Sequence, residues 1–254
     1  MSFRGGARSV IDSQGRDVNS RNDERGNAPL SRSARTEAVE AFIREARRVG
    51  ASADRGRLIF ALDATMSRQP TWDLAQSLQG RMFEATAALG GLDVQLVFFR
   101  GFGECRASDF VGGGQGLAAL MAKIACRGGR TQIAKVFRHA LEETGARRIG
   151  ALVFVGDAME EKPDELCELA GRLGLIGVKA FMFHEGGDVE AGAAFREIAR
   201  LTGGAYAAFD ASAPRRLAEL LSAAAAYAAG GLAELERRAT KGEDAARLLL
   251  SQMG

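Results

Sequence analysis

Short runs of consecutive apolar residues alternate along this chain with segments in which apolar residues recur at helical spacing. The runs lie at residues 58–62, 94–99, 149–155, 176–183 and 205–209, and their polar interruptions are Gln95 and Lys179. Strands with one solvated face alternate polar and apolar residues, whereas strands that are apolar throughout are buried on both faces. Buried strands separated by helices are typical of a mostly parallel sheet flanked by helices. The sequence therefore predicts a doubly wound α/β fold.

Helical periodicity fills the intervals between these runs. One helix is expected to start near Pro70, with Leu74, Leu78, Met82, Ala85 and Leu89 on one face. Further helices are expected at residues 117–125 and 133–141, after Pro163, around 195–201, and at 217–227. Residues 102–109 could form a short edge strand.

The 254 residues suit one sizeable α/β domain with extensions. Four segments are predicted: a disordered arm at 1–35, an amphipathic helix (36–49) and linker within 36–56, the α/β domain at 57–228, and a helical extension at 229–254. The arm is rich in arginine, serine, asparagine and glycine and has few apolar residues, which is typical of disorder.

The composition is that of an ordinary globular protein, with 46% hydrophobic and 26% charged residues. A net charge of +2 does not indicate a nucleic-acid partner, and no apolar stretch is long enough to span a membrane. The N-terminus has no apolar run typical of a secretory signal. Three widely spaced cysteines fit a reducing compartment, so we expect a cytoplasmic protein.

Three oxygen-bearing residues follow the first predicted strand at alternate positions: Asp63, Thr65 and Ser67. In an extended loop alternate side chains point the same way, so all three can face one point. Hard cations prefer such oxygen ligands. Taken alone, the motif could equally be a capping loop before the helix at Pro70.

Two more oxygen-bearing residues are expected at the same edge of the sheet. Thr131 follows Gly128-Gly129 at the start of a predicted helix, and Asp157 follows the strand that ends at Val155. In doubly wound sheets, ligands bind outside the carboxyl ends of the strands, near the point where the strand order reverses. Both residues should therefore lie beside the first loop.

These residues resemble the metal-ion-dependent adhesion site (MIDAS) of von Willebrand factor type A (VWA) domains, particularly cytosolic bacterial ones. That family has D-x-S-x-S after the first strand, a threonine in a second loop and an aspartate in a third. The matching residues are Asp63, Thr65, Ser67, Thr131 and Asp157. The chain departs from the pattern at Thr65, which replaces a serine, and at Met66 and Arg130, which stand where small residues are usual.

The resemblance implies a Mg²⁺ or Mn²⁺ site and a binding role, not an enzymatic one. Thr65 and Ser67 would bind the cation directly, and Asp63 and Asp157 partly through water. An Asp or Glu of a partner protein would then complete the metal shell. The helix start near Thr131 would add a favourable dipole for that anion.

Two alternatives remain open. One is a metal-dependent phosphoryl-transfer enzyme of the haloacid dehalogenase type, although Thr65 stands where such enzymes carry a second carboxylate. The other is a VWA-like scaffold that binds no metal, which Met66 and Arg130 would favour. Glu160 and Glu161 follow Asp157 and could rim the site, but they are interpreted as solvated charges near a helix start. His184 is interpreted as a structural residue.

Overall fold

The computed structural model describes residues 55–65, 69–78, 80–86, 88, 91–210 and 214–253. The predicted arm at residues 1–35 and the predicted helix at 36–49 lie outside the described residues, as do Met66 and Ser67 of the first metal loop. The sheet, its flanking helices and the other four predicted metal-site residues lie within the described part.

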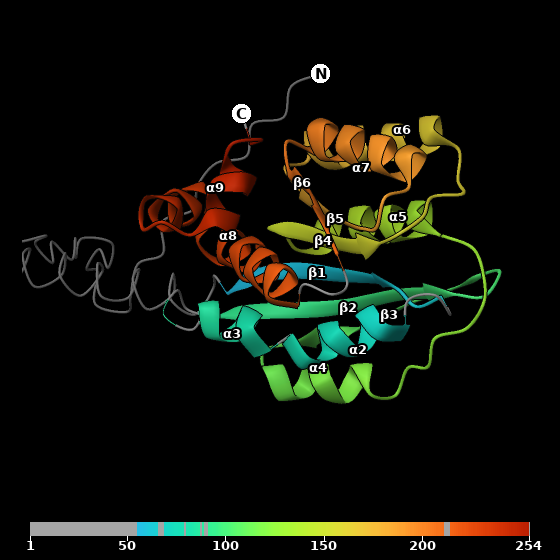
Figure 1. Cartoon of the computed structure of the whole chain (residues 1–254), viewed down its shortest axis with the longest axis horizontal. Helices are drawn as coiled ribbons and strands as arrows, with labels where there is room; N and C mark the ends of the chain where they lie inside the picture. The colour runs from blue at the N-terminus through green and yellow to red at the C-terminus, as the bar shows by residue number, and fades with distance from the viewer. Residues whose placement is uncertain are drawn as a thin grey trace, which may run out of the picture. The chain divides into compact units, whose positions relative to one another are not determined.

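Six strands of the described chain form one sheet (Figure 1). They are β1 (Gly56–Asp63), β2 (Leu92–Arg100), β3 (Glu104–Val111), β4 (Ala151–Gly156), β5 (Lys179–Glu185) and β6 (Ala205–Phe209). Their order is β3-β2-β1-β4-β5-β6, and every neighbouring pair is parallel except β2 with β3. The chain thus leaves β1 toward one side of the sheet and returns on the other side as β4. This arrangement confirms the predicted doubly wound α/β fold.

β3 is an antiparallel edge strand, joined to β2 by the turn Gly101-Phe102-Gly103. Gly101 has a φ of +62°, in the left-handed region that favours glycine. No residue of β3 is fully buried, and charged side chains such as Arg106 and Asp109 lie along it. Exposed charges discourage an edge strand from pairing with another chain. The edge strand predicted at 102–109 starts later, at Glu104, because the turn occupies residues 101–103.

The helices of the described residues are α2 (Gln69–Leu78), α3 (Gly80–Thr86), α4 (Gly114–Met121), α5 (Ile133–Ala146), α6 (Pro163–Leu175), α7 (Val189–Thr202), α8 (Pro214–Thr240) and α9 (Asp244–Leu250). The helix predicted from Pro70 to Leu89 corresponds to α2 and α3, which lie on either side of residue 79, a position outside the described residues. Among the described residues, no helix combines the length and apolar character needed to cross a membrane.

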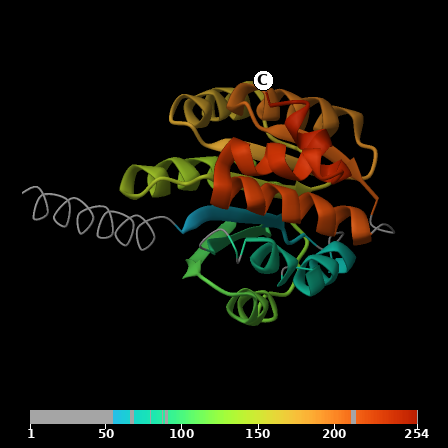
Figure 2. The same cartoon turned by 90° about the vertical axis from the view of Figure 1, so that its left-hand side faces the viewer.

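Helices cover both faces of the sheet, and each face has its own core (Figures 1 and 2). Along β1, Leu58, Phe60 and Leu62 pack with α2, α3, α4, α8 and α9. The intervening Ile59 and Ala61 pack with α5, α6 and α7 on the opposite face. All five are at most 1% exposed. Burial of both faces is the physical reason for the continuous apolar runs in the sequence.

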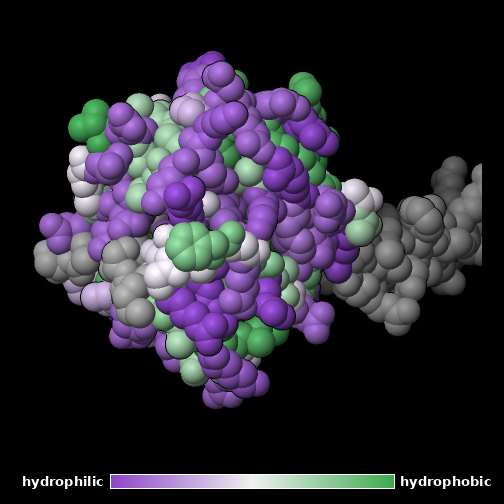
Figure 3. All heavy atoms as spheres, turned by 90° about the vertical axis from the view of Figure 1, so that its right-hand side faces the viewer, coloured by the Kyte–Doolittle hydropathy of each residue, from purple (hydrophilic) through white to green (hydrophobic). Residues whose placement is uncertain are grey.

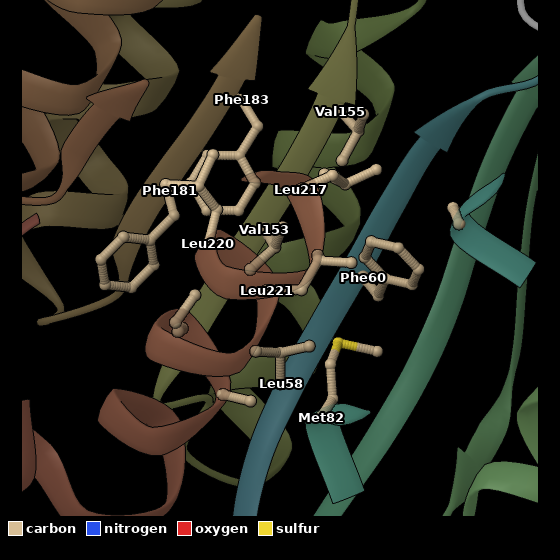
Figure 4. Close-up of a cluster of buried hydrophobic side chains, with 14 of the residues drawn as sticks. Leu58, Phe60, Met82, Val153, Val155, Phe181, Phe183, Leu217, Leu220 and Leu221 are labelled. Atoms are coloured by element: carbon tan, nitrogen blue, oxygen red, sulfur yellow. The ribbon is translucent and has the colours of Figure 1, made fainter. Parts of the chain in front are cut away.

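α8 packs on the strands in the middle of the sheet. Figure 4 shows side chains of β1, β4 and β5 that point toward leucines of this helix. These are Phe60, Val153, Phe181 and Phe183 on the strands, and Leu217, Leu220 and Leu221 on α8. Further along α8, the backbones approach so closely that a Cβ on Gly56 would lie 2.5 Å from the carbonyl oxygen of Ala228. Only glycine fits at position 56 without a shift of the helix.

The segment after residue 228 belongs to the same core. α8 continues past the predicted boundary at residue 228, with a non-helical Gly231 (φ 67°) inside it. Leu235 and Leu249 are fully buried in the core that also contains Leu58. The C-terminal segment therefore covers the sheet together with α2, α3 and α4.

A buried charge network ties this segment to α3. Arg238 is 9% exposed and donates to Glu234 at 3.0 Å and to the carbonyl oxygen of Ala85 at 2.6 Å. Arg237 also donates to Glu234, at 2.5 and 2.7 Å. The hydrogen bonds from Arg237 and then Arg238 lower the pKa of Glu234 to about 2.

We expect Gly56→Ala to lower the free energy of unfolding by about 1–3 kcal/mol, because the added methyl group overpacks against the α8 backbone. Gly171→Ala in α6 is the matched control, since nothing lies within 4 Å of a Cβ there. That variant should gain up to about 1 kcal/mol from helix propensity. Urea unfolding measures both, and an unchanged Gly56→Ala midpoint would show that α8 does not press on β1.

We expect Glu234→Gln to lower stability at pH 7 by about 1–3 kcal/mol, through loss of charged hydrogen bonds. Because folding lowers the Glu234 pKa from 4.5 to about 2, its contribution is present above pH 4.5 and is lost as the pH falls toward 2. The difference between wild type and variant should narrow over that interval. Glu236→Gln, at an exposed neighbouring position, is the control. Urea titrations across pH test this, and a constant difference would contradict it.

Candidate metal centre

The carboxyl ends of β1 and β4 lie side by side where the strand order reverses. Leu62 of β1 pairs with Val155 of β4, so Asp63 and Asp157 leave the sheet at the same edge. The chain runs from β1 toward β2 on one side, whereas β4 lies on the other. Such a divergence leaves a crevice above the strand ends. Figure 3 views the molecule from this side, where the strands of Figure 1 end.

A pocket of about 210 Å³ occupies this crevice. Its lining in the described part of the chain comprises Asp63, Thr65, Gly128, Gly129, Thr131, Asp157, Ala158 and Glu160. Four of the five predicted metal ligands thus meet around one pocket, although they come from three separate loops. The fifth, Ser67, lies outside the described residues.

The first loop is fixed by short hydrogen bonds. The Thr65 amide donates to Asp63 Oδ1 at 2.7 Å, which orients the carboxylate. Ala64 links this loop to its neighbours, because its amide donates to the Phe99 carbonyl at 2.9 Å and its carbonyl accepts from the Arg127 amide at 3.0 Å. Asp63 and Thr65 are 3% and 8% exposed, so both groups face the pocket from a nearly buried position.

The second loop lies against the β2–β3 turn. A Cβ on Gly129 would be 2.2 Å from the carbonyl oxygen of Gly101, so this position requires glycine. The Arg130 amide donates to the same oxygen at 3.0 Å. Arg130 is exposed and is not among the described residues that line the pocket. Its guanidinium therefore does not fill the place of a cation.

Glu160 and Glu161 bind the N-terminus of α5. The Thr131 amide donates to Glu160 Oε2 at 2.9 Å, and the Glu160 amide donates back to Thr131 Oγ1 at 3.0 Å. Glu161 accepts from the amides of Ile133 (2.7 Å) and Ala134 (2.8 Å). Glu161 thus supplies the acceptor that the N-terminus of α5 needs, which the N-cap residue Gln132 does not provide, and Glu160 binds the residue that precedes this cap.

This capping corrects two sequence-based interpretations. Glu160 and Glu161 are not merely solvated charges, because they join the third loop to the second. The helix dipole at Thr131 is also already compensated by carboxylates of the chain itself. A partner's anion cannot use those amides. The one sequence signal was Gln132, a poor capping residue at a predicted helix start.

His184 of β5 contacts the backbone of the third loop. This residue is 2% exposed, and its Nε2 lies 3.3 Å from the carbonyl oxygen of Asp157. A carbonyl can only accept, so Nε2 carries the proton of this bond. Nδ1 contacts the Tyr206 hydroxyl at 3.0 Å, and the ring packs edge-on against Phe195. His184 is therefore a structural residue that holds the Asp157 backbone in place.

The possible metal ligands around the pocket are hard oxygen groups. Carboxylates come from Asp63, Asp157 and Glu160, and hydroxyls come from Thr65 and Thr131. No three His, Cys, Asp or Glu side chains in the described residues are grouped so that they could hold a metal ion by themselves. A cation here would therefore depend on the threonine hydroxyls. Mg²⁺ accepts such ligands and keeps several waters, for which a pocket of this size has room.

No protein-family model matches the chain, and no curated protein matches its sequence. Solved structures do share its fold. The SpRpn10 VWA domain gives a TM-score of 0.52 at 12% identity, covering 64% of this chain and 95% of that one. Proximal thread matrix protein 1 from the mussel byssus, with a zinc-occupied MIDAS motif, gives a TM-score of 0.50 at 15% identity, and the match covers 68% of this chain and 48% of that one. The pilus adhesin SpaC from Lactobacillus rhamnosus GG gives a TM-score of 0.51 at 10% identity, and the match covers 67% of this chain and 30% of that one. The chain has the fold of VWA domains.

We expect Glu161→Ala to lower the free energy of unfolding by about 1–2 kcal/mol, because two amides of α5 lose their acceptor. Glu165→Ala is the matched control, since that carboxylate contacts α5 only through an exposed ion pair with Arg138. Loss of this ion pair should lower the free energy of unfolding by about 1 kcal/mol or less. Urea unfolding compares the two, and equal losses would mean that the cap adds nothing beyond a surface charge.

Proposed function

We propose that this chain is a divalent-cation-dependent protein-binding module that captures an acidic side chain of a partner. The observation that carries the proposal is that Asp63, Thr65, Thr131 and Asp157, from three loops, line one pocket at the edge of a VWA-type sheet. Ser67 would be the fifth ligand by its place in the sequence motif. The zinc-occupied MIDAS motif of the mussel protein shows that this fold can hold a metal at such a motif.

The chain's own groups are suited to this role. The Thr65 amide donates to the Asp63 carboxylate, and the Glu160 amide donates to the Thr131 hydroxyl. These two oxygen ligands are therefore positioned before a cation binds. A bound Mg²⁺ or Mn²⁺ would supply a Lewis-acidic position that a partner's Asp or Glu can occupy. Because the first amides of α5 are already paired with Glu161 and the Thr131 amide with Glu160, recognition of an incoming carboxylate would rest on the cation and not on the helix dipole.

A binding role is favoured over catalysis because both histidines contact other groups of the chain and the Cys105 thiol is protonated. His184 supports the Asp157 loop from a buried position, and His139 contacts the Gln95 side chain at 2.9 Å. Burial raises the pKa of the Cys105 thiol to about 11, which keeps it protonated at neutral pH. Thr65 stands where a haloacid dehalogenase-type enzyme would carry its acid/base carboxylate. The chain has only three cysteines, widely spaced in the sequence, which supports the proposal of a reducing, cytoplasmic location.

Mg²⁺ or Mn²⁺ should raise the unfolding midpoint of the wild-type protein above its value in EDTA, because a ligand of the folded state stabilises that state. At a cation concentration one hundred times Kd, the gain is about 2.7 kcal/mol. Asp63→Asn should abolish the response. The variant amide oxygen can still accept from the Thr65 amide, so the loop keeps its hydrogen bond while the charge is lost.

Asp109→Asn is the matched control, because Asp109 is exposed on the edge strand β3. It should respond to the cation as the wild type does. Isothermal titration with Mg²⁺ and Mn²⁺ gives the affinity independently of stability. A wild type without any response at millimolar cation would favour the metal-free scaffold, and an equal response in Asp63→Asn would place the cation elsewhere.

A further inference from the structure

The β2–β3 turn displays a large aromatic side chain to solvent. Phe102 is 87% exposed, and it is the only aromatic among the exposed large apolar residues of the described part. A fully solvated phenylalanine gains nothing from the fold of its own chain, whereas aromatic side chains are strong anchors in protein interfaces. Figure 3 shows apolar surface of this kind, drawn in pale green, bordered by hydrophilic surface on the side where the strands end.

This turn is fastened to the second loop of the metal pocket. Gly101 O accepts from the Arg130 amide at 3.0 Å, and Gly103 O accepts from Lys135 Nζ at 2.7 Å. Gly129 both touches Gly101 and lines the pocket. Gly101 is therefore held against the pocket wall, and Gly103 is held to Lys135 of α5. A rigid anchor loses little conformational freedom when a partner binds.

Exposed arginines stand beside the same turn and loop. Arg106 and Arg127 line a hollow of about 760 Å³ next to Gly103, and Arg130 follows the pocket residue Gly129. All three are exposed; the Arg106 side chain, which is 71% exposed, already forms one ion pair with Glu104 at 2.9 Å. We call Arg106, Arg127 and Arg130 the basic rim. It lies beside a pocket whose own charged side chains are the carboxylates of Asp63, Asp157 and Glu160.

We propose that the partner is an acidic protein segment that carries a large apolar side chain close to its metal-directed carboxylate. The apolar side chain would cover Phe102, and further carboxylates would contact the basic rim. This inference rests on the proposed function, because the metal-directed carboxylate sets the position of the segment. Phe102 would supply contact area, whereas the arginines would mainly speed and orient the encounter.

A peptide fits these features better than single-stranded nucleic acid. Proteins that bind single strands line up several aromatic side chains along a basic groove, so that successive bases can stack. Here Phe102 is the one aromatic among the exposed large apolar residues of the described part, so no row of stacking side chains is present there. The chain's net charge of only +2 also favours a protein partner.

The test is selection of a displayed random dodecapeptide library on the full chain in Mg²⁺, followed by fluorescence anisotropy with the enriched peptide. The wild type should enrich peptides that combine Asp or Glu with a large apolar residue. Phe102→Ala should weaken binding about tenfold or more, as truncation of an interface anchor does. Leu175→Ala should leave it unchanged, because Leu175 is equally exposed but ends α6, away from the turn. The double variant Arg127→Gln, Arg130→Gln should weaken binding most at low salt.

Thermal shifts with Mg²⁺ separate this inference from the proposed function. Phe102→Ala should keep the full cation response while it loses the peptide, whereas a wild type without a response would refute the metal site itself. The inference is overturned if no peptide is enriched, if the enriched peptides lack an apolar residue, or if Phe102→Ala binds as well as wild type. Phe102-dependent binding of a labelled oligothymidylate in place of peptides would equally overturn it.

Discussion

β1 is hydrogen bonded to β2 on one side and to β4 on the other, and its residues from Leu58 to Leu62 are buried on both faces. With both edges paired and both faces covered, the strand has one possible position, and its last residue, Asp63, is fixed with it. After β1 the chain continues to β2 on one side of this strand, whereas β4 lies on its other side. The loops that follow β1 and β4 therefore diverge, and the crevice lies between them.

The loops around the crevice are joined by hydrogen bonds in which backbone amides are the donors. The carbonyl of Ala64 accepts from the amide of Arg127, whereas the Thr131 and Glu160 amides donate to each other's side chains. These bonds hold the described parts of the three loops together around the pocket.

The charges around the pocket are arranged in two groups. Carboxylates line the pocket and also cap α5, so the helix start is compensated internally. Arginines and one exposed phenylalanine lie beside it, on and next to the β2–β3 turn. The VWA fold by itself does not dictate either group, since function depends on the residues placed on a fold. Any selectivity for a partner would therefore depend on the residues at this edge and not on the sheet.

The sequence by itself determined the sheet class and the places of Asp63, Thr65, Thr131 and Asp157, because apolar runs and the polar residues that follow them are local patterns. Only the tertiary structure decided the strand order, the pairing of Glu160 with Thr131, the capping of α5 by Glu161, and the approach of the β2–β3 turn, which carries Phe102, to the second loop. These features depend on contacts between residues far apart in the chain, such as Thr131 with Glu160, 29 positions away. Local periodicity carries no information about such contacts, because they arise only once the two cores bring the loops together.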